Sequence, residues 1–352
     1  MYKKITSIAI TMLGANLIAS AQLSAQSEAL EFSGSVDTYY KYDLNNIPNN
    51  ITTYFANEHN SISIGMLDLA LKKNSGKASF VGEVSFGPRG TYQSIPNAEV
   101  VTNENGVVGV SSFNIQNLYV NYAFTEKFSM TAGYMGTFVG YEVISPVANF
   151  NYSTSYLFGA GPFQNAGIKG TYAFSNKVSL MAGLFNDWNV YQDFNGVSHI
   201  GAQLTINPVE GWSAYLNFLS GKSAGAPGTG TILDLTTSYQ LNKVFKLGLN
   251  AADYSVSNNN GGYHGIAIYP QVALTPGFTL GARGEYFKVK DMPNAAGDDF
   301  TSITVTGNLR SGSFTLIPEV RFDNSSFDNF SMERQIASKN AAQFSLAAVF
   351  AF

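Results

Sequence analysis

The chain lacks cysteine and has few charged residues. With no cysteine among its 352 residues, it can form neither disulfides nor thiolate metal sites. Charged side chains make up only 12% of the sequence, which is about half of their share in an ordinary soluble domain. No internal apolar run reaches the roughly 18 residues that a membrane-spanning helix needs. The 26 Phe and 20 Tyr argue against a disordered chain.

Residue patterns for catalysis are also scarce. The sequence has three histidines, His59, His199 and His264, and none has the spacing of a metal site. Serines are so numerous that a serine near a histidine carries no information about a hydrolase. The glycines of 159–161 and 225–230 precede no helix, so they do not form a phosphate-binding loop. We therefore expect no enzyme activity, no metal and no cofactor.

The first 21 residues have the features of an export signal. Lys3 and Lys4 precede the mostly apolar segment Ile5–Ile18, and the small residues Ala19–Ala21 form a cleavage site. The predicted domains are a signal peptide at 1–21, a leader at 22–30 and a β-barrel at 31–352. Without Lys3 and Lys4, the chain's 20 basic residues fall to 18 against 24 acidic ones, a net charge of −6. This balance argues against nucleic acid as a partner.

The segment Gly167–Asp187 predicts a β-hairpin. Ile168, Tyr172 and Phe174 alternate with small or polar residues, and the alternation resumes after a short break at Ser175–Lys177. A period of two residues is typical of strands that have one apolar face. The same unit repeats along the chain, and short turns alternate strictly with longer connections.

This regular alternation predicts an all-β fold, a closed antiparallel transmembrane β-barrel of about 16 strands. Outer-membrane barrels have short periplasmic turns and long extracellular loops, and closure leaves no unpaired strand edge in lipid. One strand is irregular, because its apolar phase changes between Ile64 and Leu67. We expect a β-bulge near Gly65–Leu67.

Aromatic residues concentrate at both ends of the predicted strands. We expect those beside the short turns to lie at one membrane interface: Phe124, Phe128, Phe174, Trp212, Phe245, Phe278, Phe314 and Phe352. A second belt is expected near the long loops: Tyr40, Tyr42, Tyr134, Phe138, Phe218, Tyr286 and Phe322.

The polar face of the strands should line a water-filled lumen. Thirteen charged residues fall on this face, eight acidic and five basic: Asp37, Lys41, Asp43, Glu83, Lys169, Asp187, Asp234, Lys246, Arg283, Glu285, Glu319, Arg321 and Asp323. The alternative is that some of them form structural pairs, such as Arg283 with Glu285 or Glu319 with Arg321.

One long connection is a candidate constriction loop. Val139–Gln164 could fold into the lumen, where Glu142 and Asn149 would narrow the pathway. The alternative is an ordinary surface loop. Gly87–Ser112 is an equally long rival, and Arg89 is its only basic residue.

Several short motifs are spread along the chain: Gly133–Glu142 with Asn149, Ser153–Phe158, Gly167–Tyr172, Phe185–Trp188, Arg283–Phe287 and Pro318–Asp323. They resemble motifs of the OmpL-like β-barrel porin family. In Phe185–Trp188, Asp187 replaces the glycine of the family's Asn-Gly-Trp segment. The resemblance covers nearly all of the expected mature chain and implies an outer-membrane porin, without catalytic residues.

Together these features predict passive diffusion of small hydrophilic solutes and ions across the bacterial outer membrane. The expected partners are outer-membrane lipid, the solutes themselves and further copies of the chain in a homo-oligomer. Three alternatives stay open: a substrate-specific uptake channel, a plugged structural or surface-binding barrel, and an exported soluble β-protein.

Overall fold

The computed structural model describes residues 29–51, 53–91, 101–103, 106–108, 115–193, 195–333 and 336–352. The predicted signal peptide, most of the predicted leader and much of the rival loop Gly87–Ser112 lie outside these residues.

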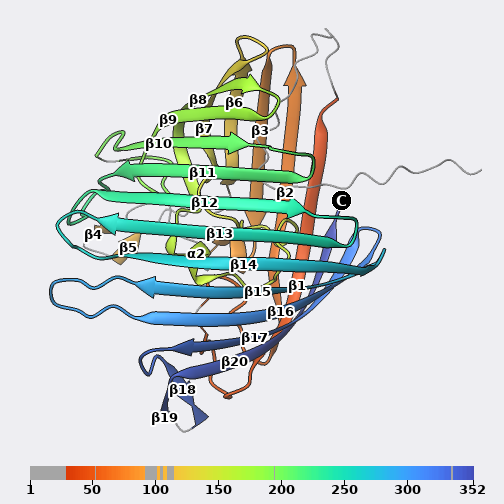
Figure 1. The fold of residues 1–352 in the computed structure, drawn as a ribbon, viewed down its shortest axis with the longest axis vertical. Helices are drawn as coiled ribbons and strands as arrows, with labels where there is room; N and C mark the ends of the chain where they lie inside the picture. The colour runs from red at the N-terminus through yellow and green to blue at the C-terminus, as the bar shows by residue number, and fades with distance from the viewer. Residues whose placement is uncertain are drawn as a thin grey trace, which may run out of the picture.

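Sixteen antiparallel strands close into a barrel (Figure 1). Their order around the wall follows the order of the chain, and pairing of the first strand with the last closes the ring. The strands are β1 (Glu31–Asp43), β2 (Ser61–Ser75), β3 (Ala78–Phe86), β6 (Ile115–Ala123), β7 (Phe128–Gly136), β8 (Gln164–Ser175), β9 (Val178–Phe185), β10 (His199–Ile206), β11 (Trp212–Gly221), β12 (Gly230–Gln240), β13 (Phe245–Val256), β14 (Gly262–Thr275), β15 (Phe278–Val289), β16 (Asp299–Ser311), β17 (Phe314–Ser325) and β20 (Asn340–Ala351). The predicted fold class and strand number are confirmed.

Short elements occupy the long connections. A two-stranded ribbon of β4 (Val101–Asn103) and β5 (Gly106–Val108) lies between β3 and β6, and one of β18 (Phe330–Met332) and β19 (Ile336–Ser338) lies between β17 and β20. The two helices are α1 (Pro88–Thr91) and α2 (Tyr156–Ala160). Within the described residues, no helix has the length and apolar character needed to cross a membrane.

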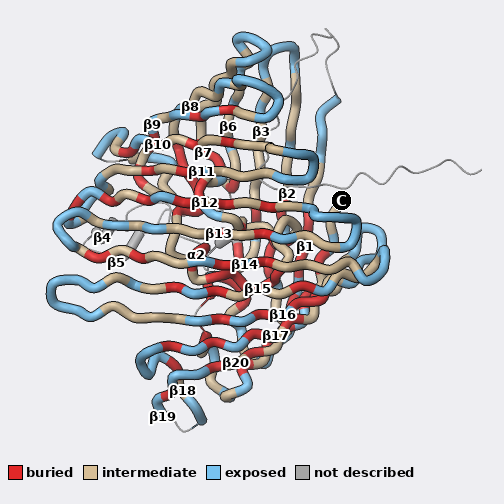
Figure 2. The backbone as a smooth tube through the Cα atoms, in the orientation of Figure 1, coloured by how far each residue is buried: buried red, intermediate tan, exposed pale blue. Residues whose placement is uncertain are grey.

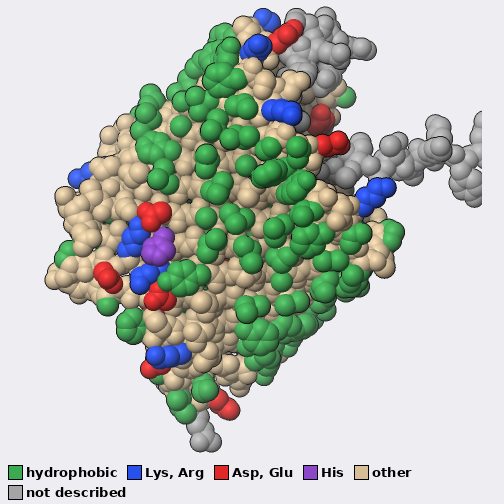
Figure 3. Space-filling model, viewed as in Figure 1, with side chains coloured by type: hydrophobic (Ala, Val, Ile, Leu, Met, Phe, Trp, Pro, Cys, Tyr) green, Lys and Arg blue, Asp and Glu red, His purple; other side chains and the backbone are tan. Residues whose placement is uncertain are grey.

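The barrel wall has one apolar and one polar face. On β9, Leu180 and Leu184 are exposed, whereas Met181 and Phe185 are buried. Figure 2 shows this alternation along many strands, and Figure 3 shows a band of apolar side chains on the outer surface with charged groups mostly at its edges. Successive side chains of a strand point to opposite faces, so this wall can face lipid outside and polar groups inside.

The predicted bulge is present in β2. Val36 pairs with Leu67 and Thr38 pairs with Ile64, so Gly65 and Met66 together face Asp37. The Met66 N–H donates to Asp37 Oδ1 over 2.8 Å. A Cβ on residue 65 would lie 1.9 Å from Asp37 Oδ2, so any larger residue here would displace the Asp37 carboxylate from its bond with Met66.

Two residues of the second aromatic belt were predicted on the wrong side. Tyr134 follows Gly133, which has a φ of +136°, and it is buried with its hydroxyl bonded to Gln164. The strand β7 ends at Gly136, two residues earlier than expected, so Phe138 leaves the wall and packs on Phe185 with ring centroids 5.4 Å apart.

Candidate functional site in the barrel lumen

The connection between β7 and β8, residues 137–163, enters the barrel and is called the inward loop below. The N–H groups of Tyr152 and Ser153 donate to Glu319 of β17 over 2.8 and 2.9 Å. At the start of α2, the N–H groups of Tyr156 and Leu157 donate to Glu285 of β15 over 3.0 and 2.8 Å. Inward carboxylates of the wall thus hold the backbone of the loop.

The centre of this contact is a buried ion pair between Glu142 of the loop and Arg283 of β15. Arg283 Nη1 lies 2.7 Å from Glu142 Oε1 and donates to the Ser153 carbonyl oxygen over 2.6 Å. The N–H and hydroxyl of Ser155 donate to Glu142 Oε2 over 2.7 and 2.8 Å. Buried charges are tolerated when hydrogen bonds of this kind offset their loss of hydration. Glu142 therefore anchors the loop, and its carboxylate is mostly shielded from lumen water.

A second arginine holds the same segment from β17. Arg321 forms a bidentate ion pair with Asp323, in which Nε to Oδ1 and Nη2 to Oδ2 are both 2.8 Å. It also donates to the Thr154 carbonyl oxygen over 2.6 Å. Its guanidinium also lies 5.0 Å from the ring centre of Tyr156. Among the described residues, neither Arg283–Glu285 nor Glu319–Arg321 forms an ion pair, because the loop supplies partners to both glutamates.

Local sequence explains why α2 begins where it does. Ser155 has extended backbone angles, and its Oγ accepts from Phe158 N over 3.0 Å, as an N-cap does. Glu285 accepts from the N–H groups of Tyr156 and Leu157, where the helix dipole favours negative charge.

Tyr152 of the inward loop also bonds the wall through its side chain. Burial raises the pKa of Tyr152 well above its ordinary value, so its hydroxyl stays protonated and donates to Asp37 over 2.5 Å.

In the first half of the inward loop, the Asn149 side chain closes a turn by bonding the main chain. Asn149 accepts from Val143 N over 3.0 Å and donates to Val143 O over 2.6 Å, which ties residues 143–149 into a ring. Arg89, from the rival segment, donates to Ile144 O over 3.1 Å and lies 4.5 Å from the ring centre of Phe55. The described part of that segment therefore braces the inward loop.

Apolar contacts fix the loop against most of the wall. Val139 and Leu157 pack with inward side chains of β9, β11, β12, β14 and β15: Met181, Phe185, Leu219, Ile232, Tyr263, Ala267, Tyr269 and Phe287. Tyr152 packs with Tyr39, Ile317 and Val349 of β1, β17 and β20. In the described part of the chain, no such cluster includes an inward residue of β2, β3, β6, β7 or β8.

Most of the other predicted lining residues also have local partners. Lys41 lies 3.4 Å from Asp43, and Asp234 accepts from Gly140 N, Asn217 and Asn250 over 3.0, 2.6 and 2.5 Å. Glu83 accepts from Asn117. Asp187 lies at the rim, where it accepts from Ser198 Oγ and Ala224 N.

Lys169 and Lys246 differ from the rest of the set. Both are partly buried on the inner face, and neither has a carboxylate of a described residue within ion-pair distance. Lys246 lines a cavity of about 610 Å³ near the short turns, together with Lys243, Glu210, Gln240 and Gln271. The structure places all thirteen residues inside the wall or at its rim, and their role in lining a pathway stays a prediction.

Sequence reasoning missed the loop residues that complete these contacts. Tyr152, Ser153 and Thr154 each bond a charged residue of the wall, and Ser155 bonds Glu142 within the loop, yet these four residues carry no charge and have no regular spacing. The family resemblance of Ser153–Phe158 was the one available signal.

A closed 16-stranded antiparallel barrel with an apolar outer surface, a polar inner face and an inward loop has the architecture of an outer-membrane porin. The chain belongs to the family described as "Putative beta-barrel porin-2, OmpL-like", whose profile matches residues 29–352. It is therefore a porin of the bacterial outer membrane.

Solved barrels share the fold at low sequence identity. Outer-membrane expressed OmpT of Vibrio cholerae has a TM-score of 0.56 and 12% identity, with 93% of this chain and 99% of that chain covered. OmpF of Salmonella typhi, in complex with daunomycin, has a TM-score of 0.58 and 12% identity, with coverages of 93% and 100%. OprB of Pseudomonas putida has a TM-score of 0.58 and 10% identity, with coverages of 92% and 94%. No curated protein matches the chain.

Proposed function

We propose that the protein admits small hydrophilic solutes and ions by passive diffusion along the part of the wall that the inward loop does not pack against. The observation that carries this proposal is the one-sided packing of the loop, which leaves the inner faces of β2, β3, β6, β7 and β8 without an apolar cluster in the described residues. These faces carry polar groups such as Asn121, Thr131 and Lys169. A polar wall beside a fixed loop suits a hydrated passage.

The anchoring of the loop supports a fixed size limit. Arg283 binds the loop through Glu142, and Glu285 and Glu319 accept from its main chain within residues 152–157; Val139, Leu157 and Tyr152 add apolar contacts to the wall. The width beside the loop would then be set by the fold, as in a passive sieve.

A substrate-specific uptake channel is the second candidate. The cavity of about 610 Å³ near the short turns combines Lys243 and Lys246 with amide side chains, and this lining could hold an anionic solute before its release. Saturable block of the current by added solute would favour this candidate. A plugged barrel without transport is the remaining alternative.

Catalysis has weak geometric support. Ser198 Oγ and Asp187 Oδ1 both approach His199 Nδ1, at 2.7 and 3.5 Å. A Ser-His-Asp triad needs the serine and the acid on opposite ring nitrogens. We therefore propose that the chain is no enzyme.

OmpT of Vibrio cholerae, which shares the fold, has a solved trimer form. We propose a homo-oligomer for this chain as well.

Planar-bilayer recording tests the proposed function. Purified protein should give stepwise, ohmic conductance that does not saturate with any single solute. Absence of steps from protein that migrates as a folded barrel on unheated gels would contradict transport and favour the plugged alternative.

A further inference from the structure

Positive charge collects at one end of the barrel. Five of the seven short turns have an exposed basic residue within them or no more than two residues away: Lys77, Lys127, Lys177, Lys243 and Arg310. These five residues are called the basic turn ring below. The same turns contain two acidic residues, Glu126 and Glu210. The turns therefore carry a net positive charge.

The opposite end has the reverse balance. In the described parts of the long connections, the exposed charged residues are four acidic and two basic: Glu58, Asp291, Asp328, Glu333, Lys222 and Lys339. The excess of positive charge is therefore specific to the short turns, which face the periplasm in an outer-membrane barrel.

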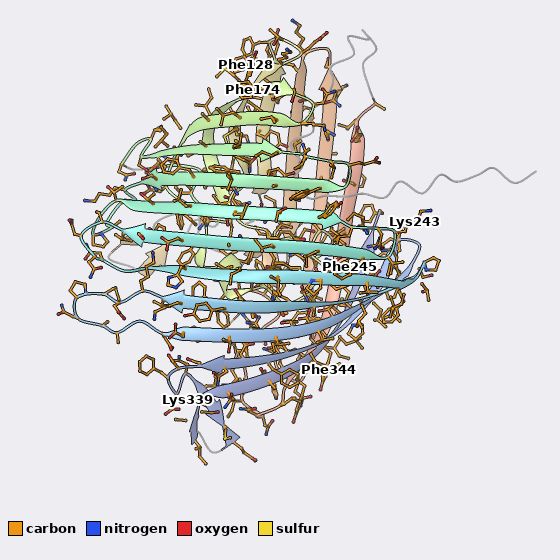
Figure 4. All side chains as sticks on the ribbon, in the orientation of Figure 1. Phe128, Phe174, Lys243, Phe245, Lys339 and Phe344 are labelled. Atoms are coloured by element: carbon orange, nitrogen blue, oxygen red, sulfur yellow. The ribbon has the colours of Figure 1, made fainter. Side chains whose placement is uncertain are left out.

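The basic turn ring lies just beyond the aromatic belt. Lys127 follows Phe124 and precedes Phe128, Lys177 follows Phe174, and Lys243 precedes Phe245. Figure 4 shows Phe128, Phe174, Lys243 and Phe245 at the turn ends of their strands. Aromatic rings favour the boundary between hydrocarbon and headgroups, and flexible lysines reach from there toward the polar side. The ring is thus at the level of lipid headgroups.

We propose that the basic turn ring binds the headgroups of anionic phospholipids, such as phosphatidylglycerol, in the periplasmic leaflet. Its five members are spread around the wall, from the β2–β3 turn to the β16–β17 turn. Lipids contact a barrel wherever its outer wall is not covered by another protein and match this spread, whereas a folded acidic protein would need a single compact patch. Basic residues near a membrane surface attract anionic lipid over a range of about one Debye length. The inference rests on the orientation of the barrel and is independent of solute transport.

The chain contains a reporter for this contact. Trp212 begins β11, is 39% exposed and belongs to the aromatic belt. Lys177 Nζ donates to Pro208 O over 3.0 Å in the turn before Trp212. On the other side, Trp212 pairs with Tyr239, four residues before Lys243. The other tryptophan, Trp188, packs on Tyr254 near the long connections, so a Trp188→Phe variant leaves Trp212 as the only tryptophan.

Fluorescence quenching tests the proposal. Trp188→Phe protein is reconstituted into vesicles of equal phosphatidylglycerol and phosphatidylcholine, with brominated chains on one lipid or the other. Brominated phosphatidylglycerol should quench Trp212 more strongly, and the preference should fade near 1 M salt, where the Debye length is about 3 Å. Adding Lys177→Gln and Lys243→Gln should reduce the preference by up to about fivefold for each lysine. The matched control, Lys222→Gln with Lys339→Gln at the opposite end, should keep it.

Two results would overturn the proposal. One is equal quenching by both brominated lipids at low salt. The other is an unchanged preference after Lys177 and Lys243 are neutralised. If polyglutamate instead shifts Trp212 emission in a lysine-dependent way while the lipids quench equally, the ring serves an acidic protein partner. Conductance measured in the same membranes separates failure of this proposal from failure of the porin function.

Discussion

Lys169 has a different environment from the other mid-strand charges of the lumen. It is the sixth residue of β8, and Arg283 is the sixth residue of β15. Around the wall, β8 lies eight strands from β16, the strand between the two that anchor the inward loop. Lys169 therefore lies across the barrel from β15 and β17, the strands that bind the inward loop. Since the carboxylates near the loop are occupied by N–H and arginine donors, we expect Lys169 to act on a passing ion as a charge without a nearby carboxylate partner.

Replacing Lys169 with Gln should reduce anion preference. Removing one accessible positive charge lowers the attraction for anions in a narrow aqueous path, so the reversal potential under a salt gradient should shift toward cation selectivity. Lys222→Gln, in an exposed connection, is the matched control and should leave the reversal potential unchanged. An identical reversal potential for Lys169→Gln and the unaltered protein would mean that ions do not pass this residue.

Replacing Glu142 with Gln should loosen the inward loop. The change leaves Arg283 buried beside a neutral amide, and loss of one partner from a buried pair costs about 3–5 kcal/mol. We expect easier unfolding in urea and a noisier, larger single-channel current. Glu142→Gln combined with Arg283→Met should regain part of the lost stability. If the single variant Glu142→Gln had the same current noise and the same urea unfolding transition as the unaltered protein, the anchoring role would be contradicted.

At the scale of elements, the inward loop and the wall are held by different interactions. The wall depends on backbone pairing between neighbouring strands, and the sixteen-strand ring closes without the loop. The loop depends on side chains, since wall carboxylates and arginines bind its main chain. The two can therefore be changed separately.

Replacing residues 141–160 by a short Gly-Ser linker should open the lumen and preserve the barrel. Conductance should rise several-fold, because the loop no longer fills the centre, and the inner charges of β15 and β17 become hydrated. Unheated electrophoresis should still show the folded form. A shortened protein with the original conductance would show that the loop does not limit the pathway.

A carboxylate outside the strands should make one rim contact sensitive to pH. Asp298 accepts from Ser325, Ser326 and Asn329, which joins the connection before β16 to the one after β17. Burial raises the pKa of Asp298, but these hydrogen bonds lower it more, so its pKa lies below the ordinary value. A lowered pKa stabilises the contact above the ordinary pKa, and that contribution is lost as pH falls through the lowered pKa.

Pepsin digestion measures this loss. The exposed Phe327 lies inside the contact, so cleavage there should accelerate as acid protonates Asp298, after correction for cleavage of a reference peptide. An Asp298→Asn variant should be cleaved quickly across the whole pH range. Equal pH profiles for both proteins would remove Asp298 as the titrating group.

At the scale of the whole molecule, the parts that the sequence predicts are the ones determined by local pattern. Period-2 alternation specifies each strand and its outward face, and even the bulge at Gly65 and Met66 leaves a change of phase. The contact of Glu142 with Arg283 joins residues 141 positions apart and leaves no such trace. Phe138 is misplaced because alternation is extended past the end of β7, whereas Tyr134 lies within β7 and follows Gly133, whose positive φ interrupts the alternation. The alternation also cannot show which inward-facing charged side chains will form hydrogen bonds with a loop.

The orientation of the whole wall can be tested on two adjacent residues. Ile168 is 43% exposed on the outer face in the middle of β8, and Lys169, the next residue, faces the lumen. Ile168→Arg places a charge in the hydrocarbon and should cost about 2–4 kcal/mol near the bilayer midplane. Lys169→Arg keeps a charge on the aqueous side and should change stability little, since the lumen hydrates both side chains. Urea unfolding in lipid bilayers gives both values, and a similar small cost for the two variants would mean that the outer band of Figure 3 does not face lipid.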